Sequence, residues 1–258
     1  MPTTVHPTAV VDSHAELHDG VVIGPYAVIG PNVVLEKNVK VMSQAVIDGY
    51  TTVGENTQIY PKGVIGLRPQ DLKYHGEKSY VKIGRNNTIR EFVTINSSTG
   101  ENTSTVIGDN CLLMAYTHIA HNCRIGNEVL MANLASLSGH SIVEDKAMLS
   151  GLVGVHQYVN IGTMSITGGA SKVIQDVPPY SLSDGNPCRV RDINRIGLKR
   201  HGIDSETRMI IRRAFKILFL SGHNMKIAIQ IVRDEIPPLP QIDHLIEFIQ
   251  KSKRGIGR

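Results

Sequence analysis

The sequence predicts a parallel β solenoid followed by a small helical domain. From Val5 to Val173 an aliphatic residue returns at every sixth position, and only four of the 29 positions in this series are neither aliphatic nor Met. Small or β-branched residues recur four positions after most of these anchors, and Gly, Asn and Asp are frequent between them. A period of six matches neither an α-helix nor a single strand, but it is typical of a coil in which each face is one short strand and one turn.

Three such faces close a triangular coil of 18 residues, so residues 18 apart are expected to stack. Neighbouring strands lie about 4.8 Å apart, which predicts roughly nine coils in a prism about 45 Å long. Each coil packs only on its neighbours, so the inward aliphatic columns hold the solenoid together. At about 25 cal/mol per Å² of apolar surface, each buried anchor contributes on the order of 1.5–3 kcal/mol.

Two segments break the period and are predicted to be loops that leave the prism. Residues 67–80 are polar and contain one proline, and residues 97–105 are rich in Ser, Thr, Gly and Asn. Loops that leave a regular solenoid commonly carry substrate-binding groups. We therefore expect functional side chains in both segments, within a first domain that spans residues 1–186.

The solenoid is expected to end near Pro178 and Pro179, because adjacent prolines cannot continue a ladder of backbone hydrogen bonds. Helical periodicity follows over three segments, residues 205–220, 225–235 and 242–251. Ser-Gly and Pro-Pro pairs mark the ends of the first two. We interpret residues 187–258 as a helical domain that covers the open C-terminal coil.

The composition is that of an ordinary globular protein. No apolar run approaches the roughly 18 residues of a membrane span, and residues 1–10 do not resemble a signal peptide, so we expect a cytoplasmic protein without a membrane span. The three cysteines, Cys111, Cys123 and Cys188, form no CxxC pair and are expected to be buried thiols. Trp is absent and no aromatic platform for nucleic acid is found, so no nucleic-acid partner is expected.

Positive charge is concentrated in the second domain. Residues 187–258 carry 15 Lys or Arg against 7 Asp or Glu, whereas residues 1–186 carry 12 against 16. A basic face is often only solvated surface, but it can also receive an acidic protein or phosphate groups.

One corner of the predicted coil combines a base with a bare backbone amide. His121, Gly139 and Gln157 are spaced by 18 residues and should lie one above another. An imidazole with its ordinary pKa near 6.5 takes a proton from an alcohol at neutral pH. A glycine N–H with no side chain in the way can donate to an oxyanion. A single histidine on a solenoid corner is usually structural, so it is the shared column that favours a catalytic site.

Six motifs accompany the six-residue repeat. They are Gln70-Asp71-Leu72-Lys73-Tyr74, His118-Ile119-Ala120-His121-Asn122-Cys123, Leu137-Ser138-Gly139-His140, Val155-His156-Gln157, Gln175-Asp176-Val177-Pro178-Pro179-Tyr180 and Gly197-Leu198-Lys199-Arg200. In this order they resemble the UDP-N-acetylglucosamine 3-O-acyltransferase family of lipid A biosynthesis. The resemblance covers nearly the whole chain, and it implies a left-handed parallel β-helix assembled as a homotrimer with sites between subunits.

The resemblance also implies an activity. Members transfer an (R)-3-hydroxyacyl chain from acyl carrier protein to the 3-hydroxyl of UDP-N-acetylglucosamine, the first step of lipid A biosynthesis. By this likeness His121 is the general base, and the Gly139 N–H polarises the thioester carbonyl. Contacts to the nucleotide sugar are expected at Asp71, Lys73, His118, His140, Gln157, Asn194 and Arg200. The acyl and pantetheine path is expected along Gly151, His156, Ile166 and Gly169. No metal is implied, and no cofactor beyond the phosphopantetheine that carries the acyl donor.

Several positions depart from the family pattern. Asn122 stands where members often have Asp beside the base, so an amide or carbonyl has to orient His121. Ile196 occupies the position of an acidic uridine contact, and Pro187 replaces a histidine that some members have. Gly169 leaves space at the end of the expected acyl channel, which favours a longer chain. The acyl length, and the choice between a 3-hydroxyl and a 3-amino acceptor, stay open.

Three other interpretations fit parts of the pattern. The related N-acyltransferase of the same pathway carries an additional N-terminal domain, whereas the coils here begin at Val5. A γ-type carbonic anhydrase also places its zinc histidines on such a prism, and His118, His121 and His140 are candidates for that set, but it leaves the loop at Asp71 unexplained. A purely structural or binding solenoid predicts no effect when His121 is replaced.

Overall fold

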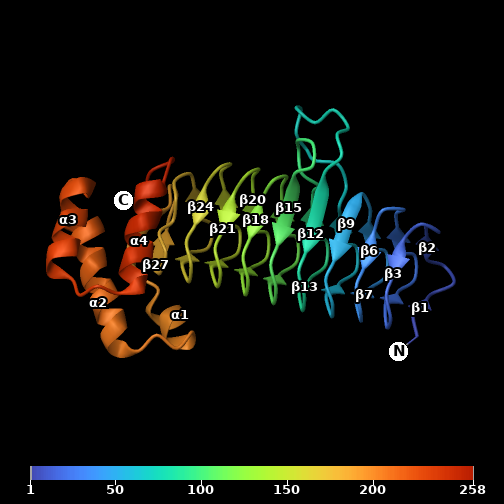
Figure 1. Cartoon of the computed structure of the whole chain (residues 1–258), viewed down its shortest axis with the longest axis horizontal. Coiled ribbons are helices and arrows are strands. Elements are labelled where there is room, and N and C mark those ends of the chain that lie inside the picture. Colours follow the sequence, from blue (N-terminus) through green and yellow to red (C-terminus); the bar gives the residue numbers. More distant parts are fainter. Residues whose placement is uncertain (1, 258) are drawn as a thin grey trace.

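The computed structural model describes residues 2–257 and shows a prism of short strands with helices at one end (Figure 1). In the coils, each strand pairs in parallel with the strands three places before and after it in the chain. The backbone therefore winds through three sheets in turn, which we call A, B and C. The predicted solenoid with three short faces per coil is confirmed.

The three sheets meet at three edges, which we name A–B, B–C and C–A after the sheets they join. Sheet A contains β1 (Thr4–Val5), β4 (Val22–Ile23), β7 (Lys40–Val41), β10 (Gln58–Ile59), β13 (Thr88–Ile89), β16 (Leu112–Leu113), β19 (Leu130–Met131), β22 (Met148–Leu149), β25 (Ile166–Thr167), β27 (Ser181–Asp184) and β28 (Arg189–Ile193). Sheet B contains β2 (Val10–Val11), β5 (Val28–Ile29), β8 (Val46–Ile47), β11 (Val64–Ile65), β14 (Thr94–Ile95), β17 (His118–Ile119), β20 (Ser136–Leu137), β23 (Gly154–Val155) and β26 (Lys172–Val173). Sheet C contains β3 (Glu16–Leu17), β6 (Val34–Leu35), β9 (Tyr50–Val53), β12 (Tyr80–Ile83), β15 (Ser104–Ile107), β18 (Arg124–Ile125), β21 (Ile142–Val143) and β24 (Asn160–Ile161).

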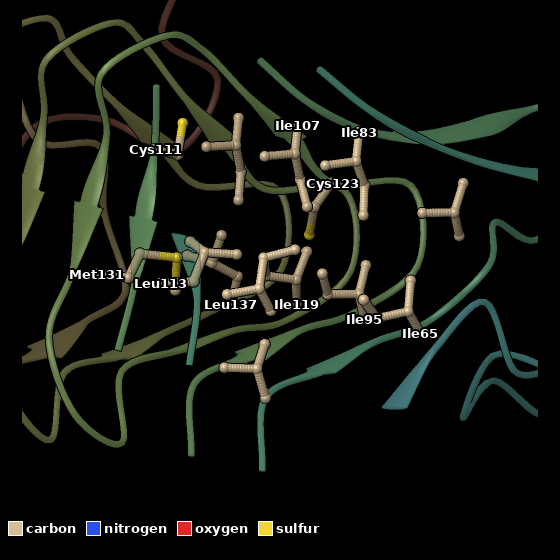
Figure 2. Packing of buried hydrophobic residues seen from close by; sticks show 14 of the residues in the cluster. Ile65, Ile83, Ile95, Ile107, Cys111, Leu113, Ile119, Cys123, Met131 and Leu137 are labelled. Carbon is tan, nitrogen blue, oxygen red and sulfur yellow. The ribbon is translucent and has the colours of Figure 1, made fainter. Parts of the chain in front are cut away.

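The aliphatic anchors form the core of the prism. Ile65, Ile95, Ile119 and Leu137, from successive strands of sheet B, lie in one row inside it, and all four are fully buried (Figure 2). The three cysteines are also buried and free, as the sequence predicted. Burial raises the pKa of the Cys123 thiol to about 12 and that of Cys111 and Cys188 to about 11, so all three are protonated at neutral pH.

The two loops preserve the six-residue phase because each adds a multiple of six. Val53 pairs with Ile83, thirty residues further on, and Ile83 pairs with Ile107, twenty-four further on, where the regular coil has eighteen. The strands resume at Tyr80 and Ser104, so both loops end slightly earlier than predicted. Both leave the prism at the B–C edge, between β11 and β12 and between β14 and β15.

The C-terminal region differs from the expectation in two respects. The Pro178–Pro179 pair does not stop the ladder, because β27 follows it and pairs in parallel with β25. The prolines span the corner before this strand, where their missing N–H groups are not needed. Strand β28 then turns back antiparallel to β27, so a hairpin precedes the helices.

Four α-helices and one π-helical segment complete the chain. They are α1 (Arg195–Arg200), α2 (Ser205–Phe215), η1 (Lys216–Leu220), α3 (Met225–Glu235) and α4 (Pro240–Lys251). The three predicted helical segments are confirmed by α2 with η1, by α3 and by α4. Helix α1 was not predicted, because a helix of six residues is too short to show a periodic pattern. The helices bury a second apolar cluster around Phe215, Leu218 and Leu245. None of the helices in residues 2–257 has both the length and the apolar character needed to cross a bilayer.

Replacing Ile119 by Asp is expected to destabilise the prism by several kcal/mol. Ile119 is fully buried in the middle of the core, so the substitution would place an unpaired charge where water cannot reach it. The free energy of unfolding, measured with urea, checks this. Val28→Asp is the matched control, because Val28 points outward from the same sheet and is 39% exposed. Equal losses in the two variants would contradict the inward orientation.

His244 joins the last helix to the prism. Its Nε2 lies 3.3 Å from Glu144 Oε2, and its Nδ1 lies 3.1 Å from the Tyr180 hydroxyl. The hydrogen bond to Glu144 raises the pKa of His244 above its ordinary value of 6.5. Burial works against the ionisation of Glu144, but the hydrogen bonds that it accepts from His244 and from the Thr163 N–H hold its pKa below 4.5. Burial raises the pKa of Tyr180 to about 12, so its hydroxyl stays neutral.

The stability that this pair contributes is expected to depend on pH. The His244 contribution is fully present below 6.5 and is lost as pH rises through the raised pKa, whereas the Glu144 contribution is present above 4.5 and is lost as pH falls through the lowered pKa. His244→Gln should therefore cost on the order of 1 kcal/mol at pH 6 and less at pH 9. Urea unfolding of both proteins at the two pH values tests this. A loss that is the same at both would contradict the ion pair.

Candidate active site

Both loops and the predicted site corner lie on the B–C edge. The corner of His121 joins β17 to β18, and the corner of Gly139 joins β20 to β21. The first loop, residues 66–79, and the second loop, residues 96–103, cross the same edge in the preceding coils. In Figure 1 the loops project together from one side of the prism, next to β12 and β15.

The imidazole of His121 lies directly against Gly139. A Cβ atom on Gly139 would lie 2.5 Å from both Cε1 and Nε2 of the ring. The two corners are adjacent, since the His140 N–H donates to the His121 carbonyl at 3.1 Å. Within residues 2–257 the Gly139 N–H has no acceptor, although its carbonyl accepts from the Tyr158 N–H. The structure thus brings the predicted imidazole and the bare amide together.

Asn122 takes the place of a carboxylate beside this imidazole. Its Oδ1 lies 2.8 Å from His121 Nδ1. The amide is itself held, because the Thr99 N–H donates to Oδ1 at 3.1 Å and Nδ2 donates to the Thr99 carbonyl at 3.0 Å. With Oδ1 fixed as an acceptor, Nδ1 carries the hydrogen and Nε2 keeps its lone pair. The second loop therefore orients His121 through the Asn122 amide, in the position where members of the acyltransferase family often have a carboxylate.

Asp71 reaches the same corner from the first loop. Its Oδ2 lies 3.7 Å from His121 Nε2, and the two side chains are only 17% and 15% exposed. The Lys73 N–H donates to Asp71 Oδ1 at 3.0 Å and holds the pKa of this carboxyl below its usual range. The carboxylate is therefore charged at neutral pH and stabilises an imidazolium formed at His121. The Lys73 side chain is exposed next to it.

Two further histidines line the site in neutral form. His118 lies on β17, and its Nδ1 is 2.7 Å from the Thr94 hydroxyl. His140 lies edge-on to His121, with 5.3 Å between ring centroids, and stacks on Tyr158 at 4.5 Å. Burial lowers the pKa of both His118 and His140 below 6.5, so both are hydrogen-bonding groups without charge at pH 7.

Comparison with known proteins identifies the family of this chain. A family model described as UDP N-acetylglucosamine O-acyltransferase, domain 2, matches residues 176–257, and a bacterial transferase hexapeptide model matches residues 104–139. A relative from Thermodesulfovibrio yellowstonii, named acyl-(acyl-carrier-protein) UDP-N-acetylglucosamine O-acyltransferase, is 48% identical over 255 residues, which are 98% of this chain and 99% of the relative. The chain belongs to the UDP-N-acetylglucosamine O-acyltransferase family.

Other members of the family agree. A protein of the same name from Chlamydia caviae is 46% identical over 99% of this chain and 92% of its own length. The crystal structure of a UDP-N-acetylglucosamine acyltransferase from Bacteroides fragilis matches with a TM-score of 0.96 at 36% identity, over 99% of this chain and all of that one. The predictions of an O-acyltransferase and of a left-handed parallel β-helix are confirmed. The relatives favour this family over the carbonic anhydrase and N-acyltransferase alternatives.

The structure divides the residues of the expected acyl path between two edges of the prism. Gly151 and Gly169 occupy successive corners of the A–B edge, and the Ala170 N–H donates to the Gly151 carbonyl between them. Ile166 lies on β25 in sheet A. His156 follows β23 and is exposed with Gln157 beside the B–C edge. Within one chain, therefore, Gly151, Ile166 and Gly169 are separated from His121, whereas His156 shares its edge.

The two residues predicted in the tail lie near a third edge. Asn194 caps helix α1, since its Oδ1 accepts from the Gly197 N–H and its Nδ2 donates to the Met164 carbonyl at the C–A edge. It is nearly buried, so its side chain holds α1 on the prism. Arg200 ends α1 and is exposed, and Ile196 beside it is 68% exposed. In Figure 1 helix α1 and the loops lie on opposite sides of the molecule.

No group of three His, Cys, Asp or Glu side chains in residues 2–257 converges in a way that could hold a metal ion. Thr99, which holds Asn122, could not be identified from the sequence, because this contact joins two segments that share no period. Its only sequence signal is that it belongs to the second interruption of the repeat.

Proposed function

We propose that the protein transfers an (R)-3-hydroxyacyl chain from acyl carrier protein to the 3-hydroxyl of UDP-N-acetylglucosamine in the cytoplasm, as the first step of lipid A biosynthesis. The observation that carries the proposal is the oriented His121 imidazole against the bare Gly139. Relatives that share the whole chain are named for this donor and acceptor. The phosphopantetheine of the carrier protein brings the acyl group, so no other cofactor is required.

The geometry accounts for each step. His121 Nε2 removes the proton of the sugar hydroxyl as its oxygen attacks the thioester carbonyl carbon. The Gly139 N–H donates to the oxyanion that forms, and the charged Asp71 stabilises the imidazolium. As the C–S bond breaks, the thiolate of the carrier takes the proton from His121. An ester and a free thiol result, and His121 returns to its starting state.

The predicted contacts need more than one copy of the chain. The residues expected to bind the nucleotide sugar are divided between the B–C edge, with Asp71 and His140, and the C–A edge near Arg200. Those expected to line the acyl path are divided between the B–C edge, with His156, and the A–B edge, with Gly151 and Gly169. One ligand cannot reach two separate edges of one prism. We therefore infer a homotrimer in which the edges of neighbouring copies face each other.

An exposed apolar ridge on the A–B edge supports this assembly. It consists of Phe92, Tyr116, Leu134 and Leu152, whose exposed fractions are 38, 53, 48 and 62%. Phe92 and Tyr116 stack with 4.7 Å between their centroids. A row of apolar side chains of this kind usually marks an interface. Its position beside Gly151 makes it a suitable wall for both a second copy and an acyl chain.

Helix α1 supplies a basic surface for the acidic carrier protein. Arg195, Lys199, Arg200 and Arg208 surround an open cavity of about 620 Å³ with Ile196. Charge of one sign steers the encounter with a partner of opposite sign. This surface also suits the diphosphate of the nucleotide sugar.

The direct test is to incubate the protein with UDP-N-acetylglucosamine and a panel of (R)-3-hydroxyacyl carrier proteins, and to weigh the product. The expected product is an acyl ester whose mass gives the preferred chain length. Hydroxylamine cleaves an ester faster than an amide, so the same sample distinguishes a 3-hydroxyl from a 3-amino acceptor when both sugars are offered. Absence of any acylated sugar would overturn the proposal.

A further inference from the structure

The first loop is not anchored by the core of the prism. None of residues 67–80 belongs to the buried apolar cluster, and Leu72 at its tip is fully exposed. A cavity of about 280 Å³ separates the loop from the coil beneath, lined among others by Tyr50, Tyr74 and Ser97. Polar contacts must therefore hold Asp71 where it lies.

Most of these contacts join the first loop to the second. The Ser97 N–H donates to the Leu67 carbonyl at 3.0 Å, where both loops begin, and the Asn102 N–H donates to the Lys78 carbonyl at 2.8 Å, where both end. The Lys78 N–H also donates to Glu101 Oε2 of the second loop at 3.2 Å. A second carboxylate that joins the loops is Glu77. Its Oε1 accepts from the Gly100 N–H of the second loop at 2.8 Å. Its Oε2 accepts from the His75 N–H of its own loop, also at 2.8 Å.

The backbone N–H of Glu77 itself, followed by these two charge-assisted hydrogen bonds, lowers the pKa of the Glu77 carboxyl, which is ionised at neutral pH. The turn from Asp71 to Tyr74, closed by the Tyr74 N–H on the Asp71 carbonyl at 3.1 Å, comes immediately before His75. Gly100 comes immediately after Thr99, the residue that holds Asn122. Glu77 thus lies between the segment that presents Asp71 and the segment that orients His121.

We propose that Glu77 is a positioning residue for acyl transfer, which joins the two loops so that Asp71 and the Asn122–His121 pair keep a fixed relation to the acceptor. This inference rests on the proposed function. Removing the carboxylate leaves two backbone donors without an acceptor and loosens the first loop against the second between the two points where their backbones are joined. Asp71 then leaves the sugar site, and the support of Asn122 weakens.

The test compares Glu77→Ala, Glu77→Gln and the wild type. Hydrogen exchange of the free protein is followed in peptides that cover residues 97–103, and kcat and KM are measured for each substrate. Glu77→Ala should speed exchange at residues 99–102 and lower kcat/KM for UDP-N-acetylglucosamine about tenfold or more, as expected for a lost charge-assisted contact. The KM for the acyl carrier protein should stay within about twofold, since neither loop carries a residue of the expected acyl path. Glu77→Gln keeps one acceptor oxygen and should lose less.

The control is Glu128→Ala, which removes an exposed carboxylate at the C–A edge. It should match the wild type in both measurements. Faster exchange with unchanged kinetics would show that Glu77 serves the fold alone and would overturn the proposal, as would an equal rise of both KM values. If the wild type acylates no sugar at all, the proposed function fails while the exchange result still reports whether Glu77 joins the loops.

Discussion

His121→Ala is expected to lose nearly all turnover while the protein keeps its fold. The imidazole is the one group at this corner that has a free lone pair, is oriented by Asn122 and lies against a bare backbone amide. A positioned base contributes on the order of 10²–10⁴ in rate, so kcat should fall by about that factor. The KM for UDP-N-acetylglucosamine should change less, because Asp71, His118 and His140 remain.

Product formation measured by mass, together with a thermal unfolding curve, checks this prediction. His14→Ala serves as the matched control, since His14 is an exposed histidine of an N-terminal coil. It should keep the activity of the wild type. Substantial turnover by His121→Ala would remove this residue from the role of base, and loss of the folded state would leave Gly139→Ala as the deciding variant.

Gly139→Ala is expected to reduce turnover by about 10²–10³, the usual cost of disturbing an oxyanion donor. The new methyl group would lie 2.5 Å from Cε1 and Nε2 of His121, closer than any real contact, so the ring has to move. Movement of the His121 ring breaks its hydrogen bond to Asn122 and takes Nε2 away from the hydroxyl of the acceptor sugar. The backbone of Gly139 has an ordinary φ, so the coil itself should accept alanine.

Gly154→Ala is the control for this substitution. An added Cβ there meets nothing within 4 Å, and its backbone is also ordinary. It should keep both the unfolding temperature and the turnover of the wild type. If Gly139→Ala is as active as Gly154→Ala, the bare amide and the ring beside it have no part in the reaction.

Much of the fold follows from the sequence because a solenoid is periodic. Each six-residue face repeats the same requirement for one inward aliphatic residue, so Ile95 and Ile119 report the same geometry. For the same reason the spacing of 18 residues placed His121 beside Gly139 without any structure. The six-residue period also continues in phase after both loops, since they add twelve and six residues to the regular coil of eighteen.

The remainder depends on contacts that do not repeat. Strand β27 forms after two prolines because the corner there needs no backbone donors, and helix α1 is too short to show a period. The hydrogen bonds between Thr99 and Asn122 join two segments that are 23 residues apart in the sequence and unrelated in pattern. The placement of predicted contacts on three different edges follows from the winding of the chain, which residue types alone do not reveal.

A crystal structure with UDP-N-acetylglucosamine bound would show whether His121 is the base. We expect the 3-hydroxyl oxygen of the sugar within hydrogen-bond distance of His121 Nε2, at roughly 2.6–3.2 Å, on the side that faces Gly139. A sugar bound with this hydroxyl far from Nε2, or with another side chain in contact with it, would contradict the assignment of His121 as the base.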